Sequence, residues 1–83
     1  MPANRRVVIT QNFFDEASLD YLRAHGCDAE IVKLPAGQTE ATLDVAAIKE
    51  IVGAAAGWIV GHARITREVL EALPQLQIVS RRG

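Results

Sequence analysis

The sequence has little of what would place the protein in a membrane or outside the cytoplasm. One cysteine, Cys27, excludes an internal disulfide and fits a reducing cytoplasm. No apolar run approaches the roughly 20 residues that a membrane span needs, and the first residues lack the apolar segment of a signal peptide. With only two histidines beside that cysteine, the composition also argues against a closed structural zinc site.

Several ligand classes lack their usual signatures as well. The net charge of −1 gives no indication of a nucleic-acid partner. No G-x-G-x-x-G turn and no Walker loop is present, so the sequence predicts no dinucleotide or nucleotide site within these residues. The segment 10–12 reads Thr-Gln-Asn where a receiver domain would need a phosphorylatable aspartate, which argues against a phosphotransfer receiver.

What the sequence does contain is ordinary for a small globular domain. Apolar residues make up 49% and charged residues 23% of the 83 residues. That length suits a single domain covering residues 1–83, with modest stability because a chain of this size buries only about 60–65% of its unfolded surface.

Short apolar segments alternate with helical patterns along the chain. The predicted strands are 5–10, 28–34, 58–60 and 76–80. The predicted helices run from Asp15 to about His25, from Leu43 to about Val52, and from Thr66 to Leu73. Asp15, Thr42 and Thr66 are the expected N-caps, and Pro74 prevents the third helix from continuing.

This alternation predicts an α/β fold with a parallel sheet and helices on both faces. Charges at both ends of segment 28–34 indicate an edge strand. With right-handed crossovers, the strand order becomes 2-1-3-4, the beginning of a flavodoxin-like three-layer sandwich. The chain would then be truncated before a fifth strand.

Candidate binding residues follow the third and fourth predicted strands. In open parallel sheets, ligands bind just beyond the carboxyl ends of the strands, and those positions hold Gly61 and His62, then Arg81, Arg82 and Gly83. Guanidinium groups match carboxylates and phosphates, and glycine leaves backbone amides open to close approach. An anion cradle is one interpretation. A solvated basic tail beside a loop histidine is the other, and composition alone favours it.

Other chemically active side chains have plainer explanations. The acidic residues Glu16, Asp20, Glu50, Glu68 and Glu71 fall mostly on the predicted helices, where solvated faces are expected. Cys27 lies between a helix stop and an edge strand and is interpreted as a packing residue. The sequence thus predicts no catalytic and no metal-binding residue.

Residues 58–83, WIVGHARITREVLEALPQLQIVSRRG, resemble the D-isomer-specific 2-hydroxyacid dehydrogenases, which include phosphoglycerate dehydrogenases. In that family a strand and a short polar loop precede a helix, a further strand and an Arg-x-Gly turn. The segments 7–10 and 19–22 also resemble the family's first strand and helix.

The resemblance implies a flavodoxin-like substrate-binding domain of an enzyme, usually a homo-oligomer, that transfers hydride between NAD and a small 2-hydroxy or 2-oxo acid. Arg81 and Gly83 match the family's Arg-x-Gly turn, and Gly61 and His62 match a loop near the substrate. Arg82 stands where a small residue is more usual. The family's glycine fingerprint and its catalytic arginine, glutamate and histidine would all follow residue 83, so we expect an N-terminal fragment that is inactive by itself.

A second hypothesis remains open, namely a small non-enzymatic flavodoxin-like module that binds an anion or a protein partner. An open reading frame continuing into a G-x-G-x-x-G turn would separate the two. With the chain truncated before a fifth strand, the fourth strand would lie at the edge of the sheet with apolar Leu76, Ile78 and Val79. Self-association through this edge or through uncovered helix faces is the resulting hypothesis.

Overall fold

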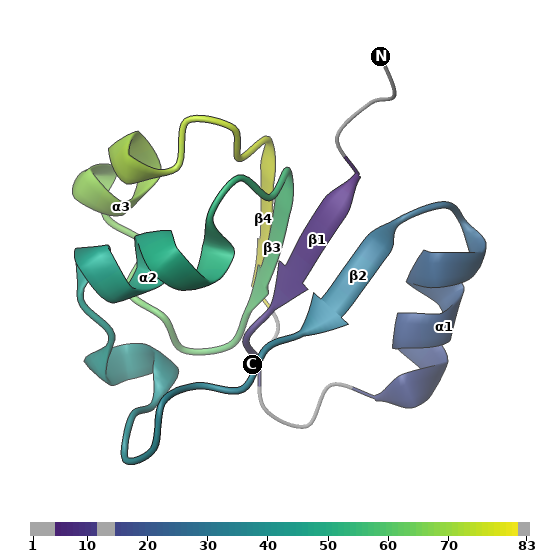
Figure 1. Ribbon diagram of the computed structural model, residues 1–83, viewed down its shortest axis with the longest axis horizontal. Helices are drawn as coiled ribbons and strands as arrows, with labels where there is room; N and C mark the ends of the chain where they lie inside the picture. Colours follow the sequence, from purple (N-terminus) through teal and green to yellow (C-terminus); the bar gives the residue numbers. More distant parts are fainter. Residues whose placement is uncertain (1–4, 12–14, 82–83) are drawn as a thin grey trace.

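The computed structural model describes residues 5–11 and 15–81 of the chain. It has the predicted flavodoxin-like α/β architecture, with a four-stranded, wholly parallel sheet in the order β2-β1-β3-β4 and helices on both faces (Figure 1). The strands are β1 (Arg6–Ile9), β2 (Asp28–Ile31), β3 (Gly57–Val60) and β4 (Ile78–Arg81). The helices are α1 (Glu16–Ala24), the 3-10 turn η1 (Glu40–Thr42), α2 (Val45–Val52) and α3 (Arg67–Ala72).

Two of the three predicted helix caps are confirmed. The Asp15 carboxylate accepts a hydrogen bond from the amide of Ser18 at 3.0 Å, and the Thr66 hydroxyl accepts one from the amide of Val69 at 3.3 Å. Each bond satisfies an amide in the first turn that has no partner within the helix.

The predicted cap of α2 is wrong. Thr42 belongs to η1, where its hydroxyl accepts from the amide of Thr39 at 2.9 Å, and Asp44 caps α2 by accepting from the amide of Ala47 at 2.8 Å. The cause is Leu43, which is buried in extended backbone between them and so separates the turn from the helix.

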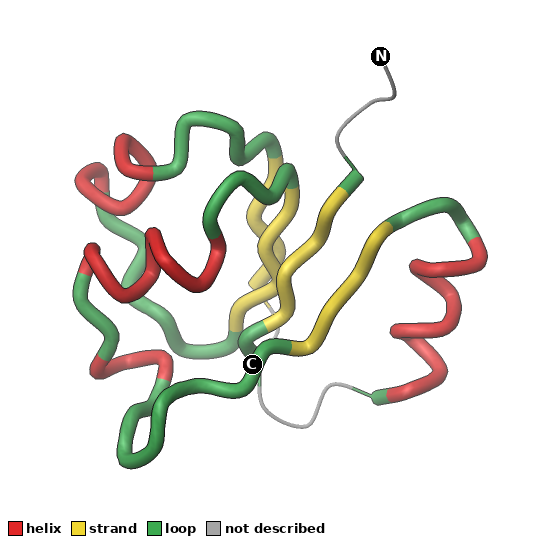
Figure 2. Tube along the Cα trace, viewed as in Figure 1, coloured by secondary structure: helices red, strands yellow, loops and turns green. Residues whose placement is uncertain are grey.

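Strand residues that pair across the sheet share one face, because side chains alternate along a strand. Val8, Trp58 and Val79 pair in register and point toward α2 and α3. Val7, Ile9 and Ile59 point to the opposite face, toward α1. Figure 2 shows α1 apart from the other helices, on the far side of the strands.

The edge strand β2 was predicted from its charges, and its position is confirmed. Arg6 of β1 reaches across to it, with its guanidinium 2.7 Å from the Glu30 carboxylate and 3.5 Å from that of Asp28. The hydrogen bond with Glu30 raises the pKa of Arg6 above its ordinary value, because it favours the charged guanidinium. Among the described residues, no helix has the length and apolar character needed to cross a membrane.

Candidate functional site

The loop that follows β3 lies at the carboxyl edge of the sheet, between the ends of β1 and β4. Thr10 continues β1 at this edge, and its amide donates to the carbonyl of Ile59 at 3.0 Å. Arg81 ends β4 opposite Val60. Because parallel strands end at one edge, residues 10, 61–63 and 81 converge there although they are far apart in sequence.

A carboxylate and a guanidinium hold this loop from two sides. The amide of Gly61 donates to both carboxylate oxygens of Glu40, at 3.0 and 3.1 Å, and the amide of His62 donates to one of them at 3.2 Å. Arg81 donates to the loop carbonyls, through Nη2 to Ala63 at 3.0 Å and through Nη1 to Gly61 at 3.4 Å. The backbone of residues 61–63 is therefore hydrogen-bonded through amides, to Glu40, and through carbonyls, to Arg81.

The Glu40 carboxylate also ends a buried hydrogen-bond chain that starts in the core. The indole Nε1 of Trp58 donates to Oγ1 of Thr10 at 2.9 Å, and that hydroxyl donates to Glu40 at 2.6 Å. Thr10 is 3% and Glu40 is 6% exposed. A buried carboxylate is costly unless donors satisfy it, and here one hydroxyl and two amides do so. We call these three donors, Thr10 Oγ1, Gly61 N and His62 N, the carboxylate cradle.

The structure brings some of the predicted site residues together. Arg81 contacts the carbonyl of Gly61, and the adjacent residue His62 is exposed to solvent. Arg82 and Gly83 lie outside the described residues. The expectation that glycine leaves the amides of this loop open is wrong for Gly61 and His62, because Glu40 occupies both.

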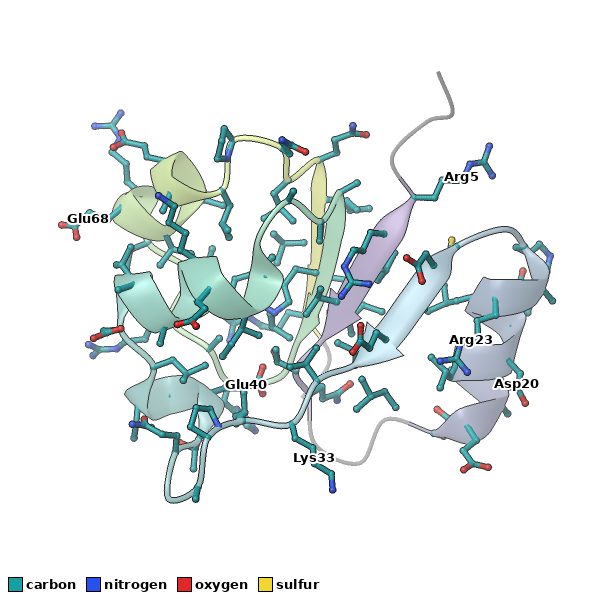
Figure 3. All side chains as sticks on the ribbon, viewed as in Figure 1. Arg5, Asp20, Arg23, Lys33, Glu40 and Glu68 are labelled. Carbon is teal, nitrogen blue, oxygen red and sulfur yellow. The ribbon has the colours of Figure 1, made fainter. Side chains whose placement is uncertain are left out.

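Sequence reasoning missed Glu40. It lies in the β2–α2 connection (residues 32–44), and residues 35–39, 41 and 42 around it are exposed. Figure 3 shows its side chain directed toward the strand ends, whereas that of Lys33 in the same connection points away. The one sequence signal was its position, an acidic residue just after a Pro-Ala-Gly-Gln turn and outside any solvated helix face.

The described residues were compared with the requirements of a metal site and of a pyrophosphate-binding turn. Within residues 5–11 and 15–81, no three His, Cys, Asp or Glu residues are grouped so that they could hold a metal ion. The pyrophosphate of NAD needs a glycine-rich turn between a strand and a helix. The turn after β3, residues 61–66, has one glycine, and its amide is bonded to Glu40. The turn after β3 therefore does not have the form of a pyrophosphate-binding turn.

An open cavity of about 260 Å³ lies between the first turns of α2 and α3. Its floor is apolar, and its rim carries charges of both signs. It is lined by Leu43, Asp44, Val45, Ile48, Arg64, Thr66, Glu68 and Val69. Of the predicted binding residues that the structure describes, Gly61, His62 and Arg81 do not line it.

The chain matches no protein-family model, no curated protein and no solved structure.

Proposed function

We propose that this chain is the substrate-binding domain of an NAD-dependent oxidoreductase that acts on the CH–OH group of D-2-hydroxy acids. The resemblance of residues 58–83 suggests the reaction. The observation that carries the proposal is the placement of Arg81, whose guanidinium lies against the 61–63 loop beside the exposed His62. A guanidinium and an imidazole at one sheet edge suit the carboxylate and the 2-oxygen of a small hydroxy acid.

In this proposal the described residues bind and orient the substrate, and they carry out no chemistry. NAD would supply or accept the hydride, and its site and the proton-transfer groups would belong to another part of the parent enzyme. The 83 residues alone are then expected to transfer no hydride. The parent enzyme is proposed to be a homo-oligomer.

A non-enzymatic anion-binding module is the second candidate. The observation that favours it is the carboxylate cradle, which already holds the carboxylate of Glu40. The encoding reading frame separates the candidates. A frame that continues into a G-x-G-x-x-G turn supports the dehydrogenase, and a frame without one supports the module.

Ligand binding tests the dehydrogenase proposal directly. We expect D-glycerate to shift the backbone amide resonances of residues 61–63 in a saturable titration. His62→Ala and Arg81→Lys should each weaken binding by about tenfold, because a hydrogen bond to a charged group contributes about 1.5–3 kcal/mol.

Arg67→Lys is the matched control, since it makes the same exchange at an exposed position on α3. It should leave the affinity unchanged. Absence of saturable shifts in the wild-type chain, or equal weakening by Arg67→Lys, would contradict the proposal.

A further inference from the structure

The carboxylate cradle has the composition of a carboxylate-binding site rather than of an ordinary loop contact. Its three groups all act as donors toward Glu40, and they converge on the two oxygens of a single carboxylate. Buried Trp58, Val60 and Ala63 belong to the core beside it. Hydrogen bonds to an ionised acceptor are stronger than neutral ones, and they strengthen further where water is excluded.

We infer that the cradle is a binding site for the carboxylate group of a small organic acid, and that Glu40 is a built-in competitor that fills it. A formate, acetate or 2-hydroxy-acid carboxylate presents the same two oxygens as the Glu40 side chain. The inference deepens the proposed function, on which it rests for the 2-hydroxy-acid class of the natural ligand.

The β2–α2 connection is built so that Glu40 can leave. Residues 35–39 are exposed and form no helix or strand, and the η1 turn is closed by hydrogen bonds among its own neighbours, residues 38, 39 and 42. The ends of the segment are held separately, since Leu43 is buried and Leu34 packs on the same core. Release of Glu40 therefore requires movement of residues 35–42 alone, and the sheet stays intact.

The same arrangement explains why an external acid would bind the wild-type chain weakly. A tethered carboxylate has a high effective concentration at the cradle. The apparent affinity of a free acid is its intrinsic affinity reduced by the fraction of molecules in which Glu40 has left. If that fraction is about one tenth or less, removal of the Glu40 carboxylate should tighten binding by about tenfold or more.

The experiment is a titration of Glu40→Ala and wild-type protein with sodium formate, against sodium chloride at equal ionic strength. Trp58 is the single tryptophan, and its Nε1 bonds to the cradle hydroxyl, so its fluorescence reports on the site. We expect a saturable formate response about tenfold or more tighter in Glu40→Ala than in wild type. Glu50→Ala, an exposed position on α2 with the same change in net charge, should behave as wild type.

Glu40→Gln is a second variant that keeps the test decisive if Glu40→Ala does not fold. Its side chain has nearly the same shape, but its amide N–H₂ must face a donor of the cradle, so it should compete poorly and formate should bind several-fold tighter than in wild type. If Glu40→Ala is unfolded without salt, recovery of its circular dichroism with formate and not with chloride supports the inference. A folded Glu40→Gln with no gain in formate affinity overturns it, as does a response that chloride reproduces.

Failure of the inference and failure of the proposed function look different. If wild-type protein binds D-glycerate through His62 and Arg81 but the Glu40 variants do not bind formate more tightly, the proposed function stands and the competitor role of Glu40 is wrong. If Glu40→Ala binds formate but no variant binds D-glycerate, the carboxylate site stands and the proposal of a 2-hydroxy-acid substrate is wrong.

Discussion

Among residues 5–11 and 15–81, the two faces of the sheet bury very different amounts of side chain. Toward α2 and α3, the core cluster contains ten buried residues, with Trp58, Ile48 and Leu73 among the largest. Toward α1, the described part of the chain contributes a cluster of three, Ile9, Leu19 and Ala29. One sheet thus has a deep face and a shallow face, and buried apolar area is the main stabilising contribution to a fold of this kind.

The candidate site belongs to the deep face. Thr10 follows Val8 by two residues and so points to the same side of the sheet, where it accepts the hydrogen bond from Trp58. Glu40 reaches the cradle from the β2–α2 connection, which packs on that same core through Val32, Leu34 and Leu43. The candidate site is therefore positioned by the more deeply packed face of the sheet.

The largest expected effect comes from removing the centre of the deep face. Trp58→Ala should cost about 3–5 kcal/mol, which approaches the whole stability of a small domain. Urea denaturation followed by circular dichroism should therefore find the variant largely unfolded. Tyr21→Ala is the control, because Tyr21 is an exposed aromatic residue on α1. Similar losses in both variants would contradict the ranking of the faces.

A matched pair of aliphatic truncations compares the faces directly. Leu19→Ala and Ile48→Ala remove the same number of carbon atoms, from the shallow and the deep face respectively. Leu19 is 9% exposed and Ile48 is 2% exposed. We expect about 2 kcal/mol for Leu19→Ala and about 3–4 kcal/mol for Ile48→Ala in the same urea denaturation experiment. An equal or larger loss at Leu19 would show that the shallow face contributes as much as the deep one.

The fold could be predicted because its evidence is local in the sequence. The alternation of apolar strands and helical segments, the charges of β2, and caps such as Asp15 and Thr66 act over a few residues. The cap of α2 was mistaken because Thr42 and Asp44 are both good caps, and burial of Leu43 between them decides the choice. Burial depends on the assembled fold, which a local pattern does not contain.

The site could be predicted only in part, for a related reason. The rule that ligands bind at strand ends directed attention to Gly61, His62 and Arg81, and the parallel topology does bring these positions to one edge of the sheet. That rule did not identify Glu40, because the role of Glu40 depends on two amides about twenty residues further along the chain. The crossover through α2 and β3 brings those amides to its carboxylate. Nothing in the residues around Glu40 has a periodicity that would mark a buried side chain.

The hydrogen-bond chain between core and site gives a smaller, more specific effect. Thr10→Val keeps the shape of the side chain but removes the hydroxyl that joins Trp58 to Glu40. We expect a loss of about 1–2 kcal/mol, since a buried donor and a buried acceptor each lose a partner while the two loop amides still bind Glu40. Urea denaturation measures the loss. Thr10→Ser restores the hydroxyl and should recover most of it, and a Ser variant no better than Val would mean that the hydroxyl contributes little.

The smallest effect on stability is expected at the outer end of the shallow face. Ile78 of β4 is 66% exposed, and β4 pairs only with β3 in the described sheet. Ile78→Lys should change the free energy of unfolding by no more than about 0.5 kcal/mol.

An exposed apolar edge strand invites pairing with a second copy, and a lysine at position 78 opposes that pairing. Sedimentation should therefore give a wild-type mass that rises with protein concentration and an Ile78→Lys mass that does not. Leu70→Lys adds the same charge at an exposed position on α3 and should leave association unchanged. A wild-type chain that stays monomeric at every concentration would mean that the edge of β4 is already protected, and the shallow face would then need no partner.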